Sequence, residues 1–192
     1  MKPGRLLIVP LSAALGGLLS ASCRTAVPFG AARRAELAGD IIAGWSDTSR
    51  LVAADMIERY GPPDALAPDG LGWKDKARWK KIVVRDRTDL RVLERGPAGV
   101  LEQTAAFRMP AQRRAELAAF GRDVRVSGDG STLTARSDEE ALNYLALNLA
   151  VAIGRGDIDA AGARSSYKRA VDLSKAGKSS ALMRELLFPP IP

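Results

Sequence analysis

Chemically reactive side chains are few in this sequence, because it holds one cysteine and no histidine among 192 residues. Without histidine the chain lacks the usual general base, the commonest metal ligand, and the Ser-His and Cys-His nucleophile pairs. Protein zinc sites are built from Cys and His, and Cys23 alone cannot form one. We therefore predict no metal site, no cofactor and no histidine-dependent catalysis.

Two short stretches come close to catalytic or phosphate-binding motifs. Ser165 and Lys168 have the Ser-x-x-Lys spacing of penicillin-binding enzymes, but the Lys-Thr-Gly and Ser-Asp-Asn elements that accompany it are absent. Residues 175–179 are similar to the end of a P-loop, yet Asp172 stands where that motif needs glycine. A glycan hydrolase that uses two carboxylates stays open, since two acids suffice for that chemistry, but no pair of acids stands out.

The cysteine follows an N-terminal segment with three parts. Lys2 and Arg5 form a basic head, residues 6–19 are uncharged and mostly apolar, and residues 20–22 are small. This order is typical of a secretory signal peptide. The apolar stretch of about 14 residues is shorter than the ~20 that a membrane-spanning helix needs, which disfavours a permanent transmembrane anchor. We predict a signal peptide over residues 1–22.

The sequence Leu19-Ser20-Ala21-Ser22-Cys23 resembles the lipobox of bacterial lipoproteins. The resemblance implies cleavage before Cys23, lipidation of its thiol with palmitate-like chains and acylation of the new amino terminus. Two or more acyl chains hold a protein stably on a membrane. The alternative is an ordinary signal peptide with an incidental cysteine.

The resemblance also implies a destination. In lipoproteins of bacteria with two membranes, aspartate after the cysteine favours the inner membrane, whereas this chain has Arg24. We therefore expect an outer-membrane lipoprotein that faces the periplasm. Cleavage removes Lys2 and Arg5 and no acid, which lowers the net charge from +7 to +5.

The rest of the chain reads as a short tether, residues 23–32, and a single domain, residues 33–192. Apolar spacing and breakers predict helices over residues 31–45 and 46–60, the second ended by Gly61-Pro62-Pro63. We predict strands near Trp73, over 79–87 and over 101–109, and a hairpin whose turn is Gly128-Asp129-Gly130. Helices are predicted over 111–120, 138–153, 158–175 and 180–188. Blocks of strands and helices favour an α+β fold, a small antiparallel sheet packed with helices, with a helical C-terminal third.

Two polar residues stand out in the predicted helix over residues 138–153. Asn143 and Asn148 lie about 140° apart around it, so they do not share a face. We expect them to bond nearby loop backbone; the alternative is that one of them contacts a ligand.

One internal motif carries a further resemblance. A helix ending in Tyr60, the Gly61-Pro62-Pro63 turn and a strand with Trp73 are similar to outer-membrane lipoproteins of the BamE (SmpA/OmlA) kind. The likeness covers residues 46–87. The mature domain also looks like uncharacterised bacterial envelope proteins, and this likeness implies no particular activity.

Basic residues concentrate between Lys74 and Arg91, where eight Lys or Arg face three acids. Lysine and arginine beside tryptophan suit the interface of an anionic membrane. We nominate a set of contacts to anionic lipid or cell-wall polymer: Trp79, Lys80, Lys81, Arg85 and Arg87. The alternative is a solvated hairpin whose charges discourage aggregation. Export makes nucleic acid an unlikely partner.

These observations favour a lipid-anchored binding or scaffold protein of the bacterial envelope, without enzyme activity, which contacts the membrane through its anchor and an envelope protein through its domain. Two alternatives remain: a carboxylate-dependent periplasmic hydrolase of glycan, and a basic surface that binds anionic lipid or cell wall directly.

Overall fold

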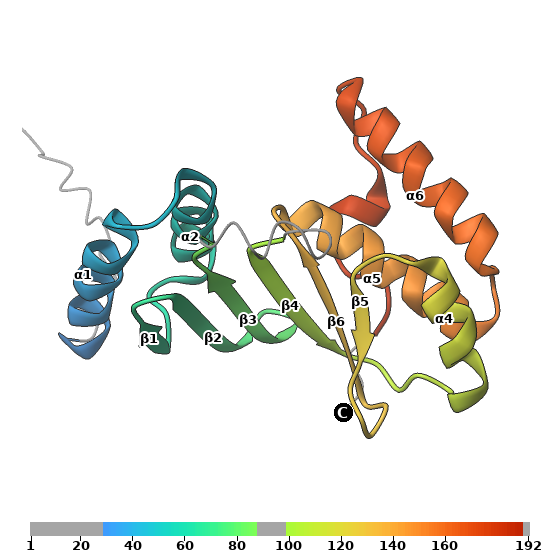
Figure 1. Ribbon diagram of the computed structural model, residues 1–192, viewed down its shortest axis with the longest axis horizontal. Coiled ribbons are helices and arrows are strands. Elements are labelled where there is room, and N and C mark those ends of the chain that lie inside the picture. Colours follow the sequence, from blue (N-terminus) through green and yellow to red (C-terminus); the bar gives the residue numbers. More distant parts are fainter. Residues whose placement is uncertain (1–28, 88–98, 190–192) are drawn as a thin grey trace, which may run out of the picture.

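The computed structural model describes residues 29–87 and 99–189. Within them, six strands form one antiparallel sheet in the order β1-β2-β3-β4-β6-β5. The strands are β1 (Ala65–Ala67), β2 (Gly70–Lys76), β3 (Trp79–Arg85), β4 (Leu101–Ala106), β5 (Val124–Val126) and β6 (Thr132–Ser137). Strands β1 to β4 follow one another as a meander, and the β5–β6 hairpin adds to β4 through β6 (Figure 1). The fold is α+β, as predicted.

Helices pack on one face of the sheet. Helix α2 (Asp47–Tyr60) contacts β2 and β3, α5 (Glu140–Arg155) contacts β4 and β6, and α1 (Phe29–Ala43) lies at the β1 edge (Figure 1). Helices α4 (Arg114–Phe120) and α6 (Ala160–Lys175) pack on α5 as an outer layer. Because α1 begins at Phe29, residues 29–32 of the predicted tether belong to a helix.

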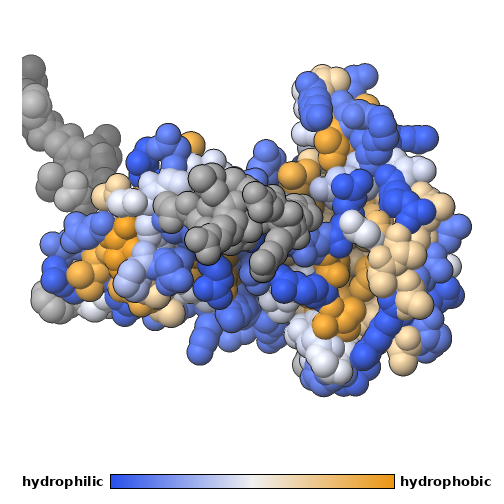
Figure 2. All heavy atoms as spheres, viewed as in Figure 1, coloured by the Kyte–Doolittle hydropathy of each residue, from blue (hydrophilic) through white to orange (hydrophobic). Residues whose placement is uncertain are grey.

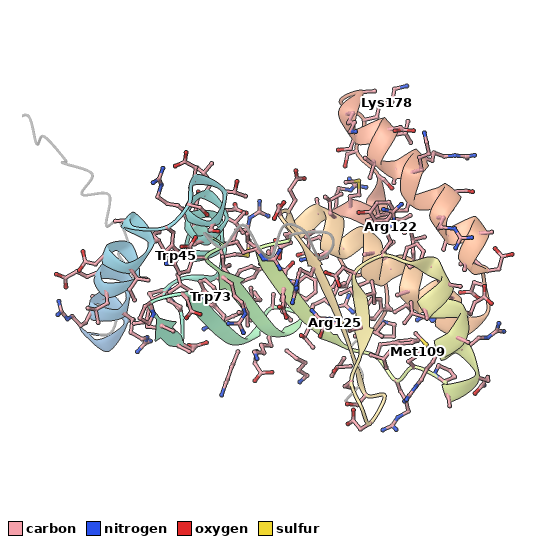
Figure 3. The ribbon with its side chains drawn as sticks, viewed as in Figure 1. Trp45, Trp73, Met109, Arg122, Arg125 and Lys178 are labelled. Atoms are coloured by element: carbon pink, nitrogen blue, oxygen red, sulfur yellow. The ribbon has the colours of Figure 1, made fainter. Side chains whose placement is uncertain are left out.

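The core lies between the sheet and these helices. Strand alternation sends every second side chain to the helix-covered face. Trp73, Ile82 and Leu133 are buried there and belong to one apolar cluster with Leu145 of α5. Trp45 and Trp73 lie where α1, α2 and the first strands meet (Figure 3). The predicted buried face of the sheet is therefore confirmed.

Helix ends and turns follow the local sequence in most places. Gly61 lies directly after the last residue of α2, with a φ of 75° that favours glycine. Asp129 in the β5–β6 turn accepts hydrogen bonds from Ser127 and Ser131, and Gly130 has a φ of 77°. The predicted hairpin is confirmed. The segment after Pro110 begins as a 3-10 turn, η1 (Ala111–Arg113), before α4.

The predicted helix over residues 180–188 is wrong, since only a 3-10 turn forms, η2 (Ala181–Met183). Apart from the bonds of this turn, the backbone there is bonded to α5. Asn148 donates to the carbonyls of Leu182 and Glu185 and accepts from the amide of Leu187. Pro189 also disfavours a helical conformation for the residue before it. The expected role of Asn148 in bonding loop backbone is thus confirmed.

Candidate functional site

A buried carboxylate lies where the helices meet the sheet. Glu140 is the first residue of α5, and its side chain is only 3% exposed. The positive end of the helix dipole favours an anion at this position. Gln103 reaches the same point because it shares the helix-covered face of β4 with Leu101 and Ala105, as every second residue of the strand does. Two local features therefore bring the site together: the start of α5 positions Glu140, and the alternation of side chains along β4 positions Gln103.

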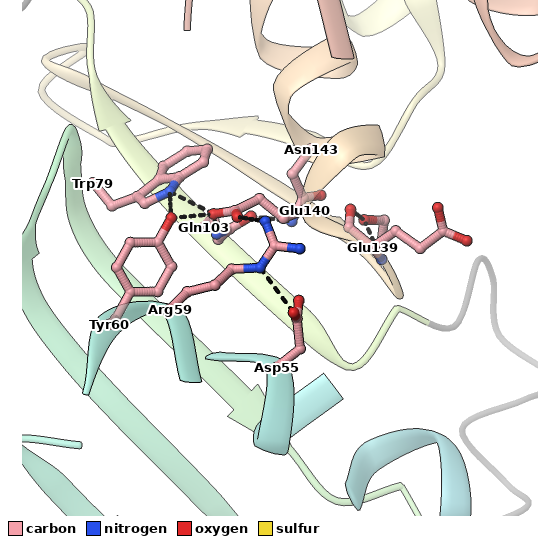
Figure 4. Close-up of polar contacts among 9 residues, drawn as sticks. Asp55, Arg59, Tyr60, Trp79, Gln103, Glu139, Glu140 and Asn143 are labelled. Carbon is pink, nitrogen blue, oxygen red and sulfur yellow. Dashed lines mark hydrogen bonds and ion pairs between the residues drawn. The ribbon is translucent and has the colours of Figure 1, made fainter. Parts of the chain in front are cut away.

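The carboxylate of Glu140 accepts hydrogen bonds from four side chains (Figure 4). Its Oε1 receives the Tyr60 hydroxyl at 2.5 Å, the Gln103 Nε2 at 2.6 Å and the Trp79 indole nitrogen at 2.8 Å. Its Oε2 receives the Arg59 Nη1 at 3.2 Å. The donors come from α2, β3 and β4, so one side chain of α5 connects three other elements. We call these five residues the Glu140 cluster.

Neighbouring groups extend the Glu140 cluster on both sides. Asn143 donates to the side-chain oxygen of Gln103 at 3.0 Å and to the carbonyl of Leu101 at 3.3 Å. Asn143 therefore bonds strand β4, not loop backbone as expected. The ring of Tyr144 stacks on Trp79 with 5.1 Å between centroids. Burial, and then the hydrogen bond to Glu140, raise the pKa of Tyr60 well above its usual value.

A cleft of about 530 Å³ opens beside the Glu140 cluster. Leu51 and Val52 of α2 form part of its apolar wall, and Met183 of η2 adds to it. Its acidic lining consists of Asp55, Asp138, Glu139 and Glu140. The size lies within the range of ligand pockets in proteins. The cleft thus has room for a small ligand or for a side chain of a partner.

The charges in this cleft are largely paired within the protein. Arg59 joins two of its acids, since its Nε donates to Asp55 at 2.8 Å while Nη1 donates to Glu140. Asp138 accepts from the amide of Val100 at 2.9 Å. The oxygens of Asp55, Asp138 and Glu140 thus already accept hydrogen bonds from groups of the protein itself. The arrangement therefore suits structural cohesion and binding better than acid–base catalysis.

The residues singled out in the sequence do not come together. Cys23 lies outside the described residues. Lys81 and Arg85 are exposed on the sheet face opposite the helices, whereas Lys80 is 3.6 Å from Asp75 in an ion pair. Arg87 is half-buried beyond the end of β3, and its amide donates to Ser49 Oγ at 3.3 Å.

The expectation that Trp79 contacts anionic lipid or cell-wall polymer is wrong. Its side chain is 1% exposed and belongs to the Glu140 cluster, so it cannot contact a membrane or polymer outside the domain. Burial along β3 is interrupted after Trp79, where Lys80 and Lys81 are both exposed before Ile82 is buried. The neighbouring Asp75 and Ala77 have positive φ angles, which marks an irregular backbone at this end of the hairpin.

The two near-motifs lie on the surface. Ser165 and Lys168 are exposed on α6, and Lys168 Nζ pairs with Asp172 at 2.6 Å, away from the serine. Residues 175–179 form the end of α6 and the turn after it. Among residues 29–87 and 99–189, no group of three or more metal-ligating side chains is found.

The sequence reasoning missed the Glu140 cluster, although signals for parts of it exist. Gln103 occupies an apolar-side position in the predicted strand, and a polar residue there must find a partner. Tyr60 ends the apolar stripe of its helix with a hydroxyl that also needs a partner when buried. Nothing in sequence spacing links these residues to Glu140, which is 80 residues from Tyr60 along the chain.

Comparison with family models, curated proteins and solved structures finds no match for this chain. The likenesses to the lipobox and to BamE-type lipoproteins therefore stay predictions from the residues that carry them. In the described ranges, no helix has both the length and the apolar composition needed to cross a bilayer.

Proposed function

We propose that this protein is a lipid-anchored binding or scaffold protein of the bacterial cell envelope, held to the membrane through Cys23. The observation that carries the proposal is the N-terminal order of a basic head, a 14-residue apolar stretch, three small residues and the single cysteine. With Cys23 acylated, no thiol remains for a disulfide. A domain stabilised by one apolar core and the Glu140 cluster is consistent with that constraint.

Binding is favoured over catalysis by the pairing of charges around the cleft. Arg59 pairs with both Asp55 and Glu140, and the chain contains no histidine. The exposed Leu51 and the apolar side chain of Met183 at the same cleft offer contact area to a partner. In this account the lipid anchor holds the protein at the membrane, and the domain contacts the partner. The proposed location is the outer membrane, facing the periplasm.

The anchor is tested by membrane fractionation of cells that express the wild type or Cys23→Ser. Wild type should stay with the membrane pellet through alkaline and high-salt washes, because two or more acyl chains hold it there. The variant should lose this resistance. Equal behaviour of the two proteins would count against the proposal.

A glycan hydrolase remains the second candidate, because Asp138, Glu139 and Glu140 line one cleft. It requires that cell-wall glycan is cut by the purified protein and that Glu139→Gln, a change at an exposed acid, abolishes the cutting. Release of soluble fragments by wild type but not by Glu139→Gln would mean that the protein is an enzyme and not a binding protein. No release by either protein would remove this candidate.

A further inference from the structure

The face of the sheet opposite the helices carries a distinct set of side chains. Strand register places Lys74 directly opposite Lys81, Lys81 opposite Thr104, and Thr104 opposite Thr134. Residues at opposed positions point to the same side of an antiparallel sheet. Their neighbours in sequence, Trp73, Ile82 and Gln103, are buried beneath the helices. We call this opposite side, which the described helices do not cover, the open face.

Three cations gather on the open face of the β2–β3 hairpin. Lys74, Lys81 and Arg85 are all exposed, and none of them makes an ion pair within the described residues. Gly70 and Gly72 add no side chain between them, and the Arg85 side chain lies over Gly70, 3.8 Å from where a Cβ would be. The hairpin therefore presents three positive groups on a surface where Gly70 and Gly72 carry no side chains.

This arrangement has an unfavourable feature that a bound anion would relieve. Like charges directly opposite in an antiparallel pair destabilise it, and Lys74 faces Lys81 in that way. The adjacent lysines are neutralised, Lys76 by Asp64 at 3.4 Å and Lys80 by Asp75 at 3.6 Å. Of the cations left without an ion pair in the described part of this hairpin, Lys74, Lys81 and Arg85 lie on the open face, whereas Arg78 of the turn donates to the carbonyl of Leu186 and lies over the Phe188 ring.

The other half of the open face is balanced. Glu102 on β4 pairs with Arg136 of β6 and lies 3.9 Å from Arg125 of β5, and Asp123 lies 3.8 Å from Arg136, so two acids face two arginines. Each strand is also rotated by roughly 20–25° from its neighbour, so a flat surface meets only two or three strands at once. A flat anionic partner would therefore touch the strands β1 to β3, where the charge is unbalanced. Figure 2 shows hydrophilic side chains along the lower edge, at the free end of this hairpin.

The anchor position makes a membrane the partner that fits. Five residues separate Cys23 from Phe29, the first residue of α1. A chain step spans at most about 3.3–3.6 Å, so α1 must begin within roughly 20 Å of an acylated Cys23. Helix α1 lies at the β1 edge, which makes β1 to β3 the part of the sheet nearest to the bilayer (Figure 1).

We propose that the open face of strands β1 to β3 lies against the anionic surface of the membrane that holds the anchor, through Lys74, Lys81 and Arg85. The proposal rests on the proposed function, because the lipid on Cys23 brings the face to that membrane. It fixes the orientation of the domain: the sheet faces the headgroups, and the helix layer with the cleft faces away from them.

The test uses the acylated protein reconstituted into vesicles of phosphatidylcholine, alone or mixed with phosphatidylglycerol. Lysines are acetylated with N-hydroxysuccinimidyl acetate and quantified by peptide mass spectrometry. Lys74 and Lys81 should be modified about fivefold less in the anionic vesicles, since one cation near such a surface gains about 1 kcal/mol. At about 1 M salt, where the Debye length is only ~3 Å, the protection should vanish. Equal modification in both vesicles would overturn the inference.

Lys175 and Lys178 serve as internal controls, because both are exposed at the far end of α6 in the outer helix layer (Figure 3 labels Lys178). Vesicle flotation on the same samples separates the two proposals. Flotation with neutral vesicles but no protection of Lys74 rejects the open-face contact alone. Flotation with the anionic vesicles but not with the neutral vesicles supports the contact and rejects the anchor. No flotation with either kind of vesicle rejects both proposals.

A variant pair gives a second readout that does not depend on the anchor. The chain from Arg24 onward contains every described helix and strand, so it retains the whole core. Changing Lys74, Lys81 and Arg85 together to Gln should weaken its binding to anionic vesicles by about tenfold or more. The matched control changes three exposed cations of the α6 end, Arg169, Lys175 and Lys178, to Gln and removes the same charge. Equal loss in both variants would contradict a specific face.

Discussion

Glu140 shows how much of this domain depends on one polar side chain. A buried carboxylate is costly unless its charge and its hydrogen-bonding capacity are satisfied. Here Arg59 supplies the counter-charge, and Tyr60, Trp79 and Gln103 supply further donors. Removal of the carboxylate would leave these three donors buried without their acceptor.

We predict that Glu140→Ala lowers the free energy of unfolding by about 2–4 kcal/mol, because the buried Trp79 and Gln103 side chains lose their acceptor, whereas Arg59 is half exposed and stays paired with Asp55. Glu139→Ala is the matched control, because it changes the neighbouring acid that is exposed, and it should stay within about 0.5 kcal/mol. Urea unfolding followed by circular dichroism measures both. Similar midpoints for the two variants would show that the cluster contributes little.

A second prediction at this scale concerns alkaline pH. Burial raises the pKa of Tyr60, Tyr144 and Tyr167 above the usual value of 10.0, and these are all the tyrosines of the chain. A raised pKa means that the folded state holds the phenol protons more tightly than the unfolded state. The associated stability is complete below pH 10 and is lost as the pH rises through the folded values.

The phenolate absorbance of the folded protein should therefore develop only above pH 10 and coincide with loss of structure by circular dichroism. The unfolded protein in urea should titrate near the ordinary tyrosine value. Phenolate formation in the folded protein at or below that value would contradict the buried positions of Tyr60 and Tyr144.

At the scale of elements, local sequence predicts the fold well wherever a strong start or stop is present. Gly61 ends α2, and the Gly-Asp-Gly turn forms the β5–β6 hairpin, both as expected. The failures come from contacts that are distant in sequence. Asn148 bonds the backbone of residues 182–187, which lie 34 to 39 positions away, and these bonds replace the predicted helix there.

The close approach of β4 and β6 gives a test at this scale. A Cβ added at Gly99 would lie 2.4 Å from the backbone nitrogen of Ser137, which is closer than atoms can approach. We predict that Gly99→Ala destabilises the domain by about 1–3 kcal/mol, the usual cost of overpacking. Gly128→Ala is the matched control, because nothing lies within 4 Å of its added Cβ. Equal thermal midpoints for the two variants would argue against this strand spacing.

At the scale of the whole molecule, the charge distribution and the proposed anchor favour the same orientation of the domain at the membrane. A chain that begins at Cys23 would keep a net charge of about +5, and the cations of the open face lie on the β2–β3 hairpin, near the β1 edge against which α1 packs. The cleft beside Glu140 lies on the opposite, helix-covered side. An anchored domain in this orientation leaves the cleft free for a partner in the periplasm.

The sequence could predict the α+β class and the basic hairpin, but it could not sort the basic residues by face. That assignment needs the register, which puts Lys81 with Lys74, and the contacts of Trp79 with Glu140 and Tyr144, where its side chain is buried. It also could not reveal the cleft, because α2, α5 and η2 contribute residues that lie up to 132 positions apart, such as Leu51 and Met183.

The central claim is that Cys23 carries the membrane anchor, and the intact mass of the protein extracted from membranes tests it most directly. Wild type should have the mass of a chain beginning at residue 23 plus acyl chains, and Cys23→Ser should lack the added mass. A wild-type protein without acyl mass, or one that retains residues 1–22, would contradict the anchored account.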